Sequence, residues 1–215
     1  ADWLPDAALR ERVLVRNPDH AWWGTAVYGG PFLDRIEYIG LGTDPAAVLA
    51  AAQAGEIDAT YRTEGDFVPA FDALGWVKSG GVTAATLTIR FHQATAPYDN
   101  RDVRKALQLA VDNAVVLELG YADMGEVAEN HHVCPIHPEY AALPPIAPAP
   151  GKAGEMIAAA GHAETEFELI SLDDSWQTNS CDAVAAQLRD AGIKVRRTIL
   201  PGSTFWKDWL SYPFS

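Results

Sequence analysis

The segment AENHHVCPIHPEY, residues 128–140, holds the side chains that are most able to do chemistry in this sequence. Three histidines and one cysteine fall within seven positions, namely His131, His132, Cys134 and His137. Imidazole and thiolate are suitable ligands for zinc or nickel, and three of these side chains follow one another at intervals of three residues. The same groups could instead be catalytic, or could lie on a rigid loop that presents them to a ligand.

The surrounding sequence argues against a metal site of an established type. Zinc motifs separate two pairs of ligands by a longer stretch, and no second pair such as CxxC or HxxxH occurs in the chain. Pro135 and Pro138 also restrict how the backbone could fold around an ion. We therefore expect neither a metal nor another cofactor, and we favour loop histidines that form hydrogen bonds to the backbone or to a ligand.

Other candidate motifs are incomplete. IGLGTDP, residues 39–45, places Gly-x-Gly where a dinucleotide fingerprint would begin, but Pro45 stands at the third glycine position. The chain has no GxSxG elbow and no P-loop. Asp173 and Asp174 follow a predicted strand and precede a predicted helix, so capping explains them better than acid–base catalysis, and Trp176 beside them could line a pocket. The sequence therefore predicts that the protein is not an enzyme.

The overall charge narrows the classes of partner. The 215 residues include 16 basic and 29 acidic ones, and the net charge of −13 repels nucleic acid and anionic lipid. No segment is long and apolar enough to span a membrane, and the acidic opening ADWLPDAALRERV is no export signal. Cys134 and Cys181 could form a disulfide, but two cysteines alone leave the compartment open.

Residues 1–92 alternate between strand and helix patterns. We predict strands at 12–17 and 33–41, a helix at 44–55, a strand at 57–62, a short helix at 64–74 and a strand at 82–91. The helix at 44–55 has complete boundary signals. Asp44 is placed to cap it, Pro45 occupies its first position, and Gly55 stands just past its end.

The second half begins with a predicted amphipathic helix at 98–112, capped by Asp99. Its apolar stripe comprises Val103, Ala106, Leu107, Ala110 and Val111. Six prolines between Pro135 and Pro150 then exclude regular structure. We predict a helix at about 152–160, a strand at 166–172, a helix at about 177–191 and a strand at 193–200. The whole is an α/β pattern with at least two parallel crossovers.

Several stretches resemble one known family. DPAAVLAAAQAGEIDAT (44–60) resembles the helix–turn–strand signature of the family 5 extracellular solute-binding proteins, the oligopeptide-, dipeptide- and nickel-type receptors of ABC importers. ATAPYDNRDVRKALQLAVDN (94–113) is similar to a second hallmark of that family. RNPDHAW (16–22) is similar to an upstream element, and DAVAAQLRDAGIKVRRTIL (182–200) to a late helix–strand unit.

The resemblance implies a type II periplasmic-binding-protein-like α/β fold, in which two lobes joined by a hinge close on a ligand. Residues 1–92 would be part of the first lobe, residues 93–215 would begin the second, and the strand Leu87–Phe91 would cross the hinge. Because family members are longer at both ends, we expect both lobes to be incomplete in this chain. The final aromatic stretch FWKDWLSYPFS agrees with that expectation.

The implied function is that of a substrate-binding receptor of an ABC importer, without bond-making chemistry. It would act in the periplasm as a monomer, capture a peptide or peptide-like solute, and deliver it to a permease in the inner membrane. A nickel-type receptor for a metal or metal chelate on the same fold is the alternative. A metal-dependent hydrolase is a more distant one, since it would need a further ligand near the histidine loop.

Eight side chains are the predicted ligand contacts on this mapping. Two follow the signature strand, two lie at the hinge, three lie on the histidine loop, and one follows SLDD: Tyr61, Arg62, Arg90, His92, Asn130, His131, His132 and Trp176. Polar cleft groups would pair with the charged ends of a ligand, and aromatic rings would cover its apolar parts. Each has an ordinary structural alternative, such as a surface ion pair for the arginines or a core position for Tyr61 and Trp176.

Overall fold

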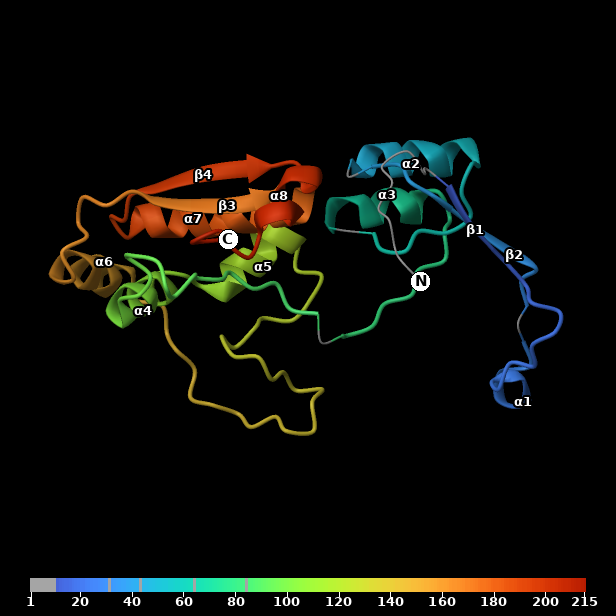
Figure 1. Ribbon diagram of the computed structural model, residues 1–215, viewed down its shortest axis with the longest axis horizontal. Helices are drawn as coiled ribbons and strands as arrows, with labels where there is room; N and C mark the ends of the chain where they lie inside the picture. The colour runs from blue at the N-terminus through green and yellow to red at the C-terminus, as the bar shows by residue number, and fades with distance from the viewer. Residues whose placement is uncertain (1–10, 31, 43, 64, 84) are drawn as a thin grey trace.

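A computed structural model describes residues 11–215 apart from residues 31, 43, 64 and 84. Its helices and strands form two groups, an N-terminal and a C-terminal unit (Figure 1). The N-terminal unit comprises β1 (Glu11–Val15), α1 (Thr25–Tyr28), β2 (Arg35–Ile39), α2 (Pro45–Ala54), η1 (Gly65–Phe67) and α3 (Val68–Ala73). The C-terminal unit comprises α4 (Arg101–Leu109), α5 (Asn113–Tyr121), α6 (Pro150–Ala159), β3 (Phe167–Leu172), α7 (Ser175–Asp190), β4 (Val195–Leu200) and α8 (Gly202–Asp208).

The N-terminal unit is held by an antiparallel strand pair and a capped helix. Strands β1 and β2 pair so that Val13 faces Glu37. The cap of α2 is as predicted, because the Asp44 side chain accepts a hydrogen bond from the N–H of Ala46 and Gly55 adopts the left-handed conformation at φ 70°.

The C-terminal unit is a β3–α7–β4 crossover with helices packed around it. Strands β3 and β4 are parallel, with Phe167 opposite Val195, and α7 lies along them in Figure 1. The predicted stripe of α4 is confirmed, since four of its five members are buried and Val111 packs against the same core. The predicted cap was wrong. Asn100 caps α4, because Asp99 still belongs to the preceding turn and its N–H donates to the carbonyl of Thr95.

Two strand predictions differ from the structure. Residues 57–62 form no strand, and the described residues contain one parallel crossover instead of at least two, because β1 and β2 pair antiparallel. A strand needs a hydrogen-bonded neighbour, and the described part of the chain places none beside residues 57–62. Apart from residue 84, which is not described, residues 82–91 likewise belong to no named strand, and Phe91 at their end bridges Phe214.

The aromatic C-terminal stretch docks on the start of the C-terminal unit. The N–H of Arg90 donates to the carbonyl of Ser215 at 2.6 Å, and the N–H of Ser215 donates back at 3.1 Å. The ring of Phe214 is buried and stacks on Phe91, with ring centroids 5.2 Å apart. The end of the predicted hinge strand is thus tied to the C-terminal unit.

The proline-rich segment is a long loop, as predicted. Residues 122–149 contain no helix or strand and run below α4 and α5 in the view of Figure 1. The Asn113 side chain donates to the carbonyl of Ala128, and the N–H of Ala149 donates to the carbonyl of Leu109. Cys134 and Cys181 are free thiols. Among the described residues, we find no helix with the length and apolarity needed to cross a bilayer.

Candidate functional site

A cavity of about 80 Å³ has walls from both units. The N-terminal unit contributes η1, and the C-terminal unit contributes the end of α5 and the start of α7. The lining residues are Gly65, Phe67, Glu118, Leu119, Gly120, Ala122, Ser175, Trp176 and Asn179. Of the eight predicted ligand contacts, Trp176 belongs to this lining.

The wall formed by α7 is fixed by an N-cap and by two hydroxyl groups that bind one carbonyl, which we call the hydroxyl clamp. Asp174 caps α7, accepting hydrogen bonds from the backbone N–H of Gln177 at 3.1 Å and from its side-chain amide at 3.0 Å. The hydroxyls of Ser171 and Thr178 both donate to the carbonyl of Leu172, at 3.0 and 2.9 Å. The turn from β3 into α7, which directly precedes Trp176, is therefore held at both ends.

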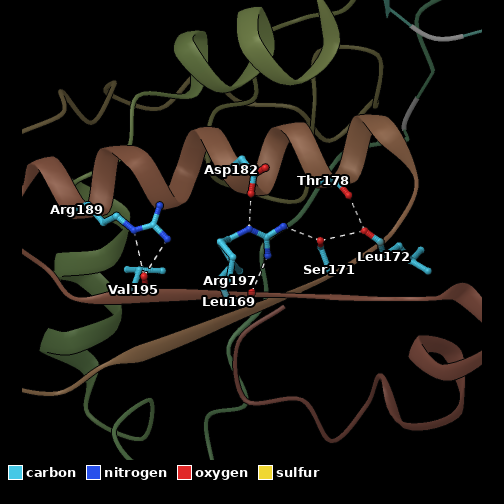
Figure 2. A network of polar contacts seen from close by, with 8 residues as sticks. All are labelled: Leu169, Ser171, Leu172, Thr178, Asp182, Arg189, Val195 and Arg197. Carbon is cyan, nitrogen blue, oxygen red and sulfur yellow. Dashed lines mark hydrogen bonds and ion pairs between the residues drawn. The ribbon is translucent and has the colours of Figure 1, made fainter.

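A buried arginine anchors this clamp to the sheet (Figure 2). Arg197 on β4 donates to the carboxylate of Asp182 at 2.7 Å, to the carbonyl of Leu169 at 2.6 Å and to the hydroxyl of Ser171 at 2.8 Å. Each nitrogen of the guanidinium thus has its own acceptor, one on α7 and two on β3. A planar fork of donors suits this arrangement, and lysine could not reproduce it.

Trp176 is the side chain at which the two units touch. Its ring meets the edge of Tyr121, with centroids 5.9 Å apart. The Cζ atom of Arg62, from the N-terminal unit, lies 5.0 Å from the centre of the indole ring. The indole Nε1 is buried and has no hydrogen-bond partner in the structure. A buried donor without an acceptor is costly, so this edge of the cavity favours a group that brings an oxygen.

The carboxylates beside Trp176 make this junction acidic. Burial raises the pKa of Asp174, while its hydrogen bonds to Gln177 and the nearby Arg62 guanidinium act in the opposite direction. Glu118 contributes a carboxylate to the lining of the cavity that Trp176 also lines. The carboxylates of Asp174 and Glu118 therefore favour a cation over an anion at this junction.

Glycine allows the close approach of α5 to α7. A Cβ atom on Gly120 would lie 2.1 Å from the hydroxyl oxygen of Ser180, so a larger residue would push the helices apart. The N–H of Asp112 donates to the side chain of Gln187 at 2.8 Å and ties the same helices at their other ends. No helix was predicted at residues 113–121, so this wall was missed from the sequence.

The two residues predicted at the hinge make their contacts with the C-terminal stretch and a nearby turn. The guanidinium of Arg90 lies 4.6 Å from the ring centre of Trp209 and donates to the carbonyl of that residue. The Nδ1 atom of His92 lies 3.0 Å from the hydroxyl of Thr95, and its backbone N–H donates to the carbonyl of Pro213. They do not line the cavity between the units.

The predicted contacts on the loop form a separate cluster. Asn130 adopts φ 62° and accepts a hydrogen bond from the Asn113 side chain. The Nε2 atom of His131 lies 3.2 Å from a carboxylate oxygen of Glu129, although it makes no hydrogen bond. Its ring stacks on Tyr140. His132 and Tyr61 are exposed to solvent. The structure thus brings Arg62 and Trp176 together and leaves these four residues elsewhere.

The histidine and cysteine side chains of the loop do not converge. Cys134 pairs with His137, whose Nδ1 lies 3.2 Å from the sulfur and accepts the N–H of Cys134 at 3.0 Å, whereas His131 faces Glu129. Over the residues that the structure describes, no three His, Cys, Asp or Glu side chains are grouped so that they could hold a metal ion.

Residues 3–215 match the family model described as bacterial extracellular solute-binding proteins, family 5 Middle. The chain belongs to this family. A probable peptide ABC transporter periplasmic-binding protein from Sinorhizobium fredii is 30% identical over 189 residues, covering 82% of this chain and 34% of that protein. The family predicted from the sequence motifs is therefore confirmed.

Solved structures show the same fold. The binding protein AgaA of A. tumefaciens R10, in complex with agropinic acid, superposes with a TM-score of 0.75 at 22% identity, over all of this chain and 43% of AgaA. The oligopeptide-binding protein AppA of Bacillus subtilis, in complex with a nonapeptide, gives 0.74 at 20% identity over 97% and 42%. The α/β fold of type II periplasmic-binding proteins is thus confirmed, and the chain spans about two fifths of these structures and about a third of the curated relative.

Proposed function

We propose that this protein is the substrate-binding receptor of an ABC importer and that it captures a peptide or peptide-like solute. Membership of the family and the peptide-type relative support the class of protein. We propose further that it acts in the periplasm as a monomer, performs no bond-making chemistry, and delivers its solute to a permease in the inner membrane.

The observation that carries this proposal is the cavity with walls from both units. Gly65 and Phe67 form one side, while Glu118, Ser175 and Trp176 form the other. Because its walls come from both units, this cavity is complete only when the units are together. A ligand held there therefore favours the closed arrangement. The unpartnered Nε1 of Trp176 adds a donor that a solute could satisfy.

In the proposed arrangement, residues 1–92 belong to the first lobe and residues 93–215 to the second. The strand Leu87–Phe91 serves as the hinge in this proposal. Among the described residues it pairs with another segment only at its end, where Arg90 and Phe91 meet the C-terminal stretch, so the residues before them can change their backbone angles at low cost. The backbone pairing of Arg90 with Ser215 ties the end of this strand to the proposed second lobe.

Trp176 is the proposed ligand contact that the geometry supports best, and Arg62 lies against its ring at the junction. The other six residues remain predictions. Arg90 and His92 lie where hinge motion would reach them, while the loop group of Asn130, His131 and His132, together with Tyr61, would meet a ligand if it extends beyond the cavity.

Native mass spectrometry of the protein, purified without added ligand, tests the proposal. Gentle activation should release a small organic molecule of defined mass, and Trp176→Ala should lower its occupancy because the donor and the ring are lost. Arg35→Gln is the control, since that side chain pairs with Glu37 on β2. Release of a single transition-metal ion, abolished by His131→Ala, would contradict the peptide proposal and support the metal-receptor alternative. Turnover of a bound peptide would contradict the non-enzymatic role.

A further inference from the structure

We propose that Trp176, Asp174 and Glu118 form a subsite for a cationic group of the ligand, and that Arg62 occupies this subsite when no ligand is bound. The ligand would be a peptide carrying a guanidinium or ammonium group. This inference rests on the proposed receptor function and specifies the solute class of the same cavity.

The chain's own guanidinium shows which group fits the site. Arg62 places its Cζ 5.0 Å from the centre of the indole ring, within the range at which a cation is attracted by the face of tryptophan. It also interacts favourably with the carboxylate of Asp174 across the junction. An aromatic face beside a carboxylate is a suitable receptor for guanidinium or ammonium.

The charge around the subsite favours a cation over an anion. Asp174 is half-buried, so its carboxylate acts through a partly desolvated region, and Glu118, which is exposed, adds a negative charge to the lining of the adjoining cavity. The start of α7 would attract an anion, but Asp174 already occupies its cap. The net charge of −13 over the whole chain also raises the local concentration of cationic solutes.

The unpartnered indole nitrogen indicates what accompanies the cation. Nε1 of Trp176 is a donor, is buried, and needs an oxygen acceptor that no described residue supplies. A peptide has carbonyl oxygens close to its amino terminus and to its side chains. One peptide residue can therefore place a cation near the ring face and the carboxylates while a carbonyl accepts the indole N–H.

Competition with Arg62 follows from this geometry. A ligand cation can reach the ring face only after the Arg62 side chain has moved away. Arg62 lies on the exposed side of the junction, so water is available to solvate it when it leaves. Removal of its charge should therefore strengthen binding of a cationic peptide, which is the opposite of the effect expected if Arg62 itself held the ligand.

Titration calorimetry with three tripeptides tests the subsite: Gly-Arg-Gly, Gly-Gln-Gly and Gly-Glu-Gly. We expect the protein to prefer Gly-Arg-Gly, and Arg62→Gln to tighten its binding about three- to fivefold, the range of a cation–π contact at a partly exposed site. Arg35→Gln makes the same change in net charge away from the cavity and should leave the affinity unchanged. Trp176→Phe should keep the preference for arginine but weaken all three peptides, because it retains the ring face and loses the donor.

The outcomes separate this inference from the proposed function. If Arg62→Gln binds Gly-Arg-Gly more weakly than the wild type does, the cation subsite is overturned and Arg62 is the group that holds the ligand. A wild-type preference for Gly-Glu-Gly that Arg62→Gln loses would lead to the same conclusion. Equal binding of Gly-Arg-Gly and Gly-Gln-Gly would also overturn it and leave the receptor proposal intact. If no tripeptide binds and no organic ligand is released in the mass spectrum, both proposals fail. Thermal unfolding of each variant shows whether it is folded.

Discussion

Strands β2 and β3 differ in burial far more than in composition. Both contain aliphatic and aromatic residues, RIEYI in one and FELISL in the other. All five residues of β2 are exposed, whereas five of the six in β3 are buried. The difference lies in what covers them. Helix α7 packs along β3 and β4, whereas among the described residues β1 and β2 pack mainly against each other.

This comparison shows that apolar strands specify a core when a neighbouring element is present to complete it. In the C-terminal unit, Phe167, Leu169 and Leu188 are almost completely buried and belong to one cluster. Hydrophobic stabilisation follows the area removed from water, so most of the free energy of unfolding of the described chain should come from this unit.

Truncation of one leucine in each unit should give the largest contrast. Leu188 on α7 is 0% exposed, and Leu14 on β1 is 55% exposed. Leu188→Ala should lower the free energy of unfolding by about 2–5 kcal/mol, because it removes buried contacts and leaves a cavity. Leu14→Ala should change it by less than about 0.5 kcal/mol. Urea unfolding followed by circular dichroism measures both, and equal losses would show that β1 is buried in solution.

The neighbouring arginines of β4 give a sharper test within the C-terminal unit. The side chain of Arg197 is 10% exposed and donates to three acceptors, whereas that of Arg196 is 53% exposed and pairs with Glu166 and Glu168. Arg197→Met should cost about 2–3 kcal/mol, since the carbonyl of Leu169 and the hydroxyl of Ser171 lose their partner.

Arg196→Met is the matched control and should cost less than about 1 kcal/mol, as is usual for an exposed ion pair. Arg197→Lys should recover part of the loss, because one ammonium cannot reach all three acceptors. A loss for Arg196→Met as large as that for Arg197→Met would contradict the role of the buried network shown in Figure 2.

Local signals in the sequence predicted the parts of the fold that depend on neighbouring residues. Asp44, Pro45 and Gly55 fixed the limits of α2, and the stripe from Val103 to Ala110 identified the buried face of α4. These features depend on hydrogen bonds and periodicity within a few residues, so a single sequence contains them. The family motifs in turn gave the fold class.

Long-range pairing was not predictable in the same way. The segment 57–62 has the composition of a strand but lies in no strand pair of the described residues, and Arg197 reads as a surface charge until β3 and α7 enclose it. The contact of Arg62 with Trp176 joins residues that are far apart in the chain. Their chemistry suggested a ligand site, but only the tertiary structure shows that they meet.

The two cysteines extend the comparison to reactivity. Burial raises the pKa of Cys181, in the core of the C-terminal unit, to about 11. Cys134 is half-buried on the loop, with the imidazole of His137 at 3.2 Å from its sulfur. At about pH 8, iodoacetamide should modify Cys134 at least about a hundredfold faster, since the thiolate is the reactive form and access is greater.

Intact-mass spectra taken during the reaction measure this difference. Cys134→Ser should leave a protein that reacts slowly until it is unfolded, and Cys181→Ser should leave the fast phase unchanged. Rapid modification of both thiols in the folded protein would show that the C-terminal unit opens more readily than its packing implies.

The smallest expected effect concerns Asp174, at the junction of the two units. Burial raises its pKa above the ordinary value, so the folded protein binds a proton more readily than the unfolded chain as the pH falls toward that pKa. The charged carboxylate therefore opposes folding above the folded pKa, and this penalty disappears on acidification. Asp174→Asn keeps a capping side chain but removes the titration.

The wild-type protein should gain stability relative to Asp174→Asn between about pH 7 and about pH 4, by less than about 1 kcal/mol because the site is half-exposed. Paired urea titrations at the two pH values measure the change. Asp174→Ala is the control, since it should lose about 1 kcal/mol of capping energy at neutral pH. A wild type that instead loses stability relative to Asp174→Asn on acidification would mean that Arg62 outweighs burial. The junction would then be held by an ion pair, and Arg62 would be harder for a ligand to displace.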